Sequence, residues 1–185
     1  MRKLTRVLGF VLIIALIPHI SCLLKSMSPE ELEAAIEITD VDTKWMEKYY
    51  QPWPPKLILV PTISFRVKNT SAQSINYVNF NAVFRFKDEN ENLGDSFMAA
   101  IRNTPVEPGE KSDTILLKCN YGVEGKSVND FQTNPGWQTA AVKLFARSKG
   151  SPYIPLGEWD VSRKIDFKEP EEVGEKPEVK KVEKK

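Results

Sequence analysis

The stretch VNFNAVFRF, residues 78–86, decides the fold class of this chain. Its apolar side chains recur at every second position: Val78, Phe80, Ala82, Phe84 and Phe86. The opposite set is Tyr77, Asn79, Asn81, Val83 and Arg85. Side chains of a β-strand point to opposite faces in turn, whereas a helix would scatter these aromatic residues around its circumference. The stretch therefore predicts a half-buried β-strand.

Similar patterns lie on both sides of this strand. Residues 62–68 and 115–119 alternate between apolar and polar side chains, and Ile115, Leu117 and Cys119 share one face. Residues 57–60 are a continuous apolar run that Pro61 is expected to interrupt, because proline lacks a backbone N–H. Further strands are expected at 97–101, 141–146 and 154–167.

Turn residues separate these strands. Polar, Gly or Pro-containing turns are expected at 69–71, 87–95 and 107–110, with a long polar loop at 122–137. One or two opening strands are expected between Ile36 and Tyr50, with a bend at 40–43, before the prolines of residues 52–55. Such short strands, without helices between them, predict an all-β fold: a single Ig-like antiparallel β-sandwich of about seven or eight strands. We assign residues 36–167 to it.

The two flanks of the predicted domain differ from it. Ser28-Pro29-Glu30-Glu31 predicts a helix start with a capping box, and we expect this short helix to end near Ala35. We assign residues 22–35 to a linker that contains it. Residues 168–185 are dominated by Glu, Lys, Pro and Val, and we expect disorder there because so little apolar surface can be buried.

The first residues have the features of an export signal. Arg2, Lys3 and Arg6 precede the apolar run 7–17, which Pro18 and His19 end. A basic start, a short apolar core and a small residue before the cut are typical of a signal peptide, which we assign to residues 1–21.

Cys22 follows Ile20 and Ser21, and this arrangement resembles the acylation site of bacterial lipoproteins. The resemblance implies a protein held at a membrane by lipid on Cys22, within the bacterial cell envelope, facing the periplasm or the exterior. Palmitate or a similar acyl chain would supply the anchor. Two alternatives stay open, namely a retained anchor from Val7 to Leu24 and ordinary cleavage that releases a secreted protein.

Residues 63–112 carry a second resemblance. A strand ends in Val67-Lys68-Asn69-Thr70-Ser71, a long strand follows, and Val106-Glu107-Pro108-Gly109-Glu110 comes after the next strand. This order is similar to the small Ig-like modules of bacterial extracytoplasmic proteins, the FxLYD-type and related domains. The resemblance implies a sandwich fold and no enzymatic activity.

Composition excludes several kinds of site. His19 is the only histidine and lies in the leader, so the processed chain would hold no His-dependent nucleophile and no imidazole zinc site. Cys22 and Cys119 are the two cysteines, and we interpret Cys119 as a small core residue. The chain has 26 Lys and Arg against 25 Asp and Glu, without the basic cluster that nucleic acid requires. We expect neither a cofactor nor a metal.

Three groups of residues are candidate sites. Gly125-Lys126-Ser127 is a poor phosphate loop, because Asn120 stands where its first glycine belongs and no helix is expected to follow. Asp40 and Asp42, with Asp88 or Glu89, lack the spacing of a calcium loop, and we expect a solvated turn. Trp45, Tyr49, Tyr50 and Trp53 are either packing residues or a platform for sugar rings.

These observations favour a non-enzymatic protein with a binding or assembly role, tethered to a membrane outside the cytoplasm. Its partner would be a protein or a cell-wall polysaccharide. The alternative function is a polysaccharide- or peptidoglycan-binding module that uses the four aromatic residues. A third, a hydrolase based on two carboxylates, has no residues that the sequence singles out.

Overall fold

The structure is a computed structural model, and it describes residues 26–87 and 92–170. Cys22, the leader, Asp88, Glu89 and residues 171–185 lie outside the described residues, so the predictions made for them stay predictions. The described residues form one helix, nine strands and a 3-10 turn. Their bounds are α1 Pro29–Ala35, β1 Ile36–Gln51, β2 Lys56–Asn69, β3 Val78–Phe86, β4 Asn92–Ile101, β5 Ile115–Lys118, β6 Val123–Gly125, η1 Asn129–Gln132, β7 Ala140–Ser148, β8 Ile154–Asp160 and β9 Ile165–Asp166.

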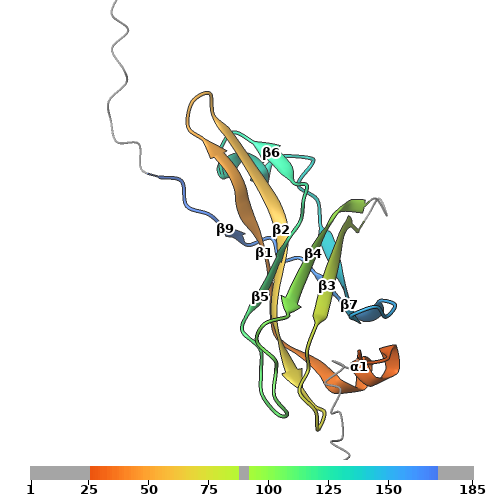
Figure 1. The fold of residues 1–185 in the computed structure, drawn as a ribbon. Coiled ribbons are helices and arrows are strands. Elements are labelled where there is room, and N and C mark those ends of the chain that lie inside the picture. Colours follow the sequence, from red (N-terminus) through yellow and green to blue (C-terminus); the bar gives the residue numbers. More distant parts are fainter. Residues whose placement is uncertain (1–25, 88–91, 171–185) are drawn as a thin grey trace, which may run out of the picture.

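The strands form two sheets that pack as a sandwich, which confirms the predicted all-β fold (Figure 1). One sheet has the order β5-β2-β1-β9, with β6 also pairing with β2, and the other has the order β4-β3-β7-β8. All pairs are antiparallel except the two-residue pairing of β1 with β9.

The predicted strand over residues 78–86 is confirmed as β3, in the middle of its sheet between β4 and β7. Its buried and half-buried residues alternate as the sequence pattern requires. The ring of Phe80 meets the ring of Phe65 from the opposite sheet edge-to-face, with centroids 5.1 Å apart. This contact joins the two sheets at the centre of the core.

The prediction that Pro61 interrupts a strand was wrong, since β2 runs through it without a break. β5 pairs with residues 62–65 and β6 with residues 57–59, so Pro61 lies in the gap between these two partner strands. Its carbonyl accepts a hydrogen bond from the Cys119 N–H at 3.0 Å. Proline is tolerated here because no ladder bond is lost where the neighbouring strand is interrupted.

β1 is a single strand with two register shifts. The first, between Thr39 and Asp42, is the predicted bend, and Asp40 there has a positive φ of 54°. The second lies between Glu47 and Tyr49 and leaves Lys48 without a direct partner on β2. Each shift inserts a residue and reverses which face the following side chains occupy.

The short helix forms where it was predicted, with its capping box intact. The Glu31 N–H donates to the Ser28 hydroxyl at 3.1 Å, and the Ser28 N–H donates to the Glu31 carboxylate at 2.9 Å. Leu32 and Ala35 are buried in the core. The helix therefore packs against the sandwich.

The predicted long loop 122–137 contains more structure than the sequence indicated. It includes β6 and the 3-10 turn η1, and Phe131 of that turn is fully buried. The predicted turn 87–95 is shorter than expected, because β4 begins at Asn92.

Asn69 joins two turns that are distant in sequence. Its buried side-chain amide donates to the carbonyls of Gln73 and Val106, both at 2.8 Å, and its side-chain oxygen accepts from the Ser71 N–H at 2.9 Å. Its backbone bonds to Gly109 and Glu110. The turn after β2 and the 107–110 turn are thus held against each other by one residue.

We predict that Asn69→Ala lowers the free energy of unfolding by about 2–3 kcal/mol, because the buried Asn69 side chain makes three hydrogen bonds to backbone groups that alanine cannot make. Urea denaturation followed by circular dichroism measures this change. Asn76→Ala is the matched control, since Asn76 makes one long bond of 3.4 Å, and it should change stability by about 0.5 kcal/mol or less. Equal losses for both variants would contradict the role assigned to Asn69.

Candidate functional site

The structure separates the four aromatic residues that the sequence grouped. Trp45 is fully buried, and its indole meets that of Trp137 edge-to-face at 6.0 Å. Tyr50 is half-buried, with its ring 5.2 Å from that of Phe167. These two residues pack in the sandwich and do not belong to an exposed platform.

Tyr49 and Trp53 lie on the surface at the end of the β1–β2 hairpin. Tyr49 is 42% exposed and Trp53 is 85% exposed. The register shift at Lys48 explains the position of Tyr49, which pairs with the outward Ile58 while Tyr50 pairs with the buried Leu57. Without that inserted residue, Tyr49 would point inward with Trp45.

The hairpin end is held together by its own side chains. The Tyr49 hydroxyl bonds to the side-chain oxygen of Gln51, and the Gln51 amide donates to the Trp53 carbonyl at 3.0 Å. Three prolines in residues 52–55 restrict the backbone around Trp53. Trp53 is thus presented on a turn with little conformational freedom to lose on binding.

The surface around Trp53 carries no charged side chain between Tyr49 and Pro55. The cations at its base are already engaged, because the Lys48 ammonium donates to the Asn120 carbonyl and Lys56 pairs with Glu124 at 2.8 Å. In Figure 1 this hairpin rises past the ends of β3 and β4. The site is therefore a projecting aromatic surface without charged residues. Such a surface is suited to binding a partner through nonpolar contacts rather than to proton transfer.

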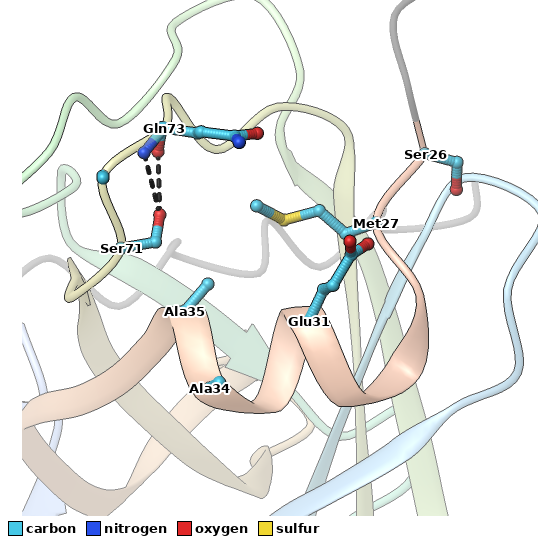
Figure 2. A pocket seen from close by; sticks show the side chains of 8 residues that line it. Ser26, Met27, Glu31, Ala34, Ala35, Ser71 and Gln73 are labelled. Carbon is cyan, nitrogen blue, oxygen red and sulfur yellow. Dashed lines mark hydrogen bonds between the residues drawn. The ribbon is translucent and has the colours of Figure 1, made fainter.

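A groove lies at the other end of the sandwich, between α1 and the loop that follows β2 (Figure 2). It has a volume of about 360 Å³. Its lining is largely apolar, with Met27, Ala34, Ala35 and Ala72. The Ser71 hydroxyl at its wall donates to the Gln73 carbonyl at 2.9 Å. The groove therefore offers mainly apolar contacts, because the Ser71 hydroxyl already bonds to Gln73.

Asp40 and Asp42, the described acids of the candidate cation site, pair with lysines. Asp40 lies 2.9 Å from the Lys111 ammonium, whose hydrogen bond lowers the pKa of Asp40. Asp42 lies 3.7 Å from Lys44, which also approaches Asp166 at 2.7 Å. The hydrogen bond between Lys44 and Asp166 raises the pKa of Lys44 and lowers that of Asp166. Within residues 26–87 and 92–170, no three His, Cys, Asp or Glu side chains gather as a metal site would require.

Two further predictions concern residues that the structure describes in full. Cys119 is buried as expected, and burial raises the pKa of its thiol, so the sulfur stays protonated. The backbone N–H groups of Lys126 and Ser127 both donate to the Asp130 carboxylate, at 2.8 and 3.2 Å. The Asp130 carboxylate therefore already accepts the hydrogen bonds that a phosphate would accept from this loop.

Sequence reasoning missed two exposed apolar residues, Phe97 and Met98 on β4. Phe97, Ala99 and Ile101 predict a strand there, but this pattern does not indicate that Phe97 and Met98 are exposed. The sequence does not reveal that β4 is an edge strand, because its position in the sheet depends on which strands pair.

The chain matches no protein-family model and no curated protein. Several solved structures resemble it, among them the following three. The putative ApaA protein from Bordetella pertussis has 10% identity and a TM-score of 0.38, over 69% of this chain and 93% of that one. The Northeast Structural Genomics Consortium target SoR45 has 8% identity and a TM-score of 0.41, over 83% and 96%.

The third is the ligand binding region of Serine-glutamate repeat protein A (SgrA) of Enterococcus faecium, with 13% identity and a TM-score of 0.26, over 62% and 87%. At TM-scores of this size the three similarities carry no argument about function. In the part of the chain that the structure describes, no helix is both long and apolar enough to span a membrane.

We predict that Trp45→Ala and Trp53→Ala differ sharply in stability. Loss of the buried Trp45 side chain should lower the free energy of unfolding by about 3–5 kcal/mol. Loss of the exposed Trp53 side chain should change it by about 0.5 kcal/mol or less. Chemical denaturation of both variants measures the difference, and a similar loss in each would contradict the separation of the four aromatic residues.

Proposed function

We propose that this protein is a non-enzymatic binding protein of the bacterial cell envelope, tethered to a membrane by lipid on Cys22 and contacting a protein partner through Trp53. Its fold would be that of an Ig-like module related to the FxLYD-type domains. The observation that carries the proposal is the position of Trp53, 85% exposed on an uncharged, proline-restricted hairpin end.

The aromatic side chains of this surface support a protein partner that packs against them. Tryptophan and tyrosine are enriched among the residues that contribute most to protein interfaces, because each buries a large, stiff side chain. Gln51 links the Tyr49 hydroxyl to the Trp53 backbone carbonyl, so both residues belong to the same hairpin end. The acids Asp40, Asp42 and Asp166 pair with lysines rather than with each other, which favours binding over carboxylate catalysis.

The arrangement of the two ends also supports a tether. The described chain begins at Ser26 beside α1, and Cys22 is four residues earlier, within about 14 Å at full extension. β1 has 16 residues and leads from α1 to the hairpin end, a path of about 50 Å. Figure 1 places α1 and the hairpin end at opposite ends of the molecule. A lipid on Cys22 would thus leave Trp53 on the side away from the membrane.

A second candidate function is binding of peptidoglycan or another polysaccharide. The near-complete exposure of the Trp53 ring favours it, since a sugar ring can stack on such a face. With Trp45 and Tyr50 packed in the sandwich, the platform would consist of Trp53 and Tyr49 alone.

We predict that Cys22→Ala releases the protein from the membrane. Intact-mass spectrometry of the wild type should show added acyl mass on a chain that begins at Cys22, and the variant should lack that mass and appear in the soluble fraction. A wild-type protein that begins at another residue without added mass would contradict the tether.

We predict that Trp53→Ala weakens partner binding about tenfold or more, as loss of a central aromatic contact does. Cross-linking in whole cells, followed by affinity measurement with the identified partner, tests this. Tyr153→Ala is the matched control, because Tyr153 is an exposed aromatic residue just before β8. Retention on purified peptidoglycan that is lost only in Trp53→Ala would instead support the polysaccharide function, and equal behaviour of both variants would contradict both.

A further inference from the structure

β4 leaves one side of its backbone without a partner strand. It ends its sheet and pairs only with β3. The Asp95 carbonyl accepts from the Asn120 N–H at 3.2 Å, so Asp95 presents its backbone groups away from β3. Because these groups alternate along a strand, those of Phe97 and Ala99 also point away from β3. Among the described residues, no backbone group bonds to them.

This open segment has defined ends. At its start, the backbone of Asp95 is already engaged by Asn120. At its end, a register shift makes Ala100 the inserted residue, and Ile101 pairs back with Val78. Phe97 and Ala99 are therefore the two residues whose outward N–H and C=O groups a new strand could engage.

The other sheet edges are short or carry proline and charged residues, which residues 96–100 of β4 lack. β8 contains Pro155, a register shift and the charged Glu158 and Asp160. β5 has four residues and ends in Lys118, and β9 has two residues. Residues 96–100 of β4 read Ser-Phe-Met-Ala-Ala, without charge or proline. Natural proteins usually protect such edges, so an unprotected one suggests a use.

The side chains of this segment are exposed as well. Phe97 faces outward and is 55% exposed. Met98 pairs with the buried Phe80 and so points toward the core side of the sheet, yet it is 39% exposed. The core is thus incompletely covered at this edge, and a strand added beside β4 would cover Met98.

We propose that a second copy of this chain pairs antiparallel with residues 96–100 of β4, with Phe97 of each copy opposite Ala99 of the other. This register is the one that engages all four outward backbone groups of Phe97 and Ala99. It gives four hydrogen bonds between the copies, two for each pair, and joins the two four-stranded sheets into one.

The segment is complementary to itself in size and charge, which favours a second copy as the occupant. Each bulky Phe97 lies opposite a small Ala99, and the two Met98 side chains meet at the two-fold axis. Asp95 precedes the segment and Arg102 follows it, so antiparallel pairing brings the acidic end of one copy to the basic end of the other.

Cysteine cross-linking tests the register directly. In a Cys22→Ala background, Met98→Cys places two thiols at a non-hydrogen-bonded pair, about 4.5 Å apart between Cα atoms, which a disulfide can bridge. Ser96→Cys is the control, because the two copies of residue 96 would lie about 13 Å apart. We expect a disulfide-linked dimer from Met98→Cys alone. Absence of that dimer, or equal yields from both cysteines, would overturn the proposal.

Sedimentation equilibrium tests the dimer without a cysteine. The Cys22→Ala protein should form a dimer whose share grows with concentration. Its Ala99→Pro variant should stay monomeric and have the same melting temperature at concentrations where both proteins are monomeric, because the Ala99 N–H makes no ladder bond within one copy. Phe97→Lys gives the same test through charge, should the proline variant lose stability. A Cys22→Ala protein that stays monomeric at its highest soluble concentration would overturn the proposal and leave β4 to a different partner strand.

Discussion

The packing of β2 against β3 is the constraint on which the rest of this structure depends. Phe65 and Phe80 meet at its centre, and β2 also pairs with three other strands, β1, β5 and β6. β2 contributes fully buried residues along its length, from Leu57 to Val67, and its first half carries β1 to the hairpin end. The hairpin that presents Trp53 is therefore an extension of the core and not a separate loop.

The sequence predicted those parts of the fold that depend on local periodicity. β3 and β5 followed from alternation, and α1 followed from a capping box whose two hydrogen bonds form as expected. The effect of Pro61 could not be predicted, because proline breaks a ladder only where a neighbouring strand requires its N–H. That requirement depends on the gap between β5 and β6, which is a tertiary property.

The candidate site shows the same division between local and tertiary information. Four aromatic residues within residues 45–53 were visible in the sequence, but the faces they occupy were not. A single inserted residue, Lys48, turns Tyr49 outward and Tyr50 inward. Alternation predicts side-chain direction only while the register is regular, and nothing local in this segment signals the insertion. The exposed edge of β4 was hidden for a similar reason, since strand order is set by distant pairs.

The three surfaces discussed above occupy different parts of the sandwich. α1 lies at one end of the molecule and the end of the β1–β2 hairpin at the other (Figure 1), and residues 96–100 lie on an edge strand of their sheet. A strand added beside β4 continues the β4-β3-β7-β8 sheet sideways and leaves the β1–β2 hairpin, which belongs to the opposite sheet, uncovered. The proposed dimer would therefore carry two Trp53 surfaces, one on each copy. A partner with two matching sites would then bind more tightly than a single contact allows, because its second contact forms within the same complex.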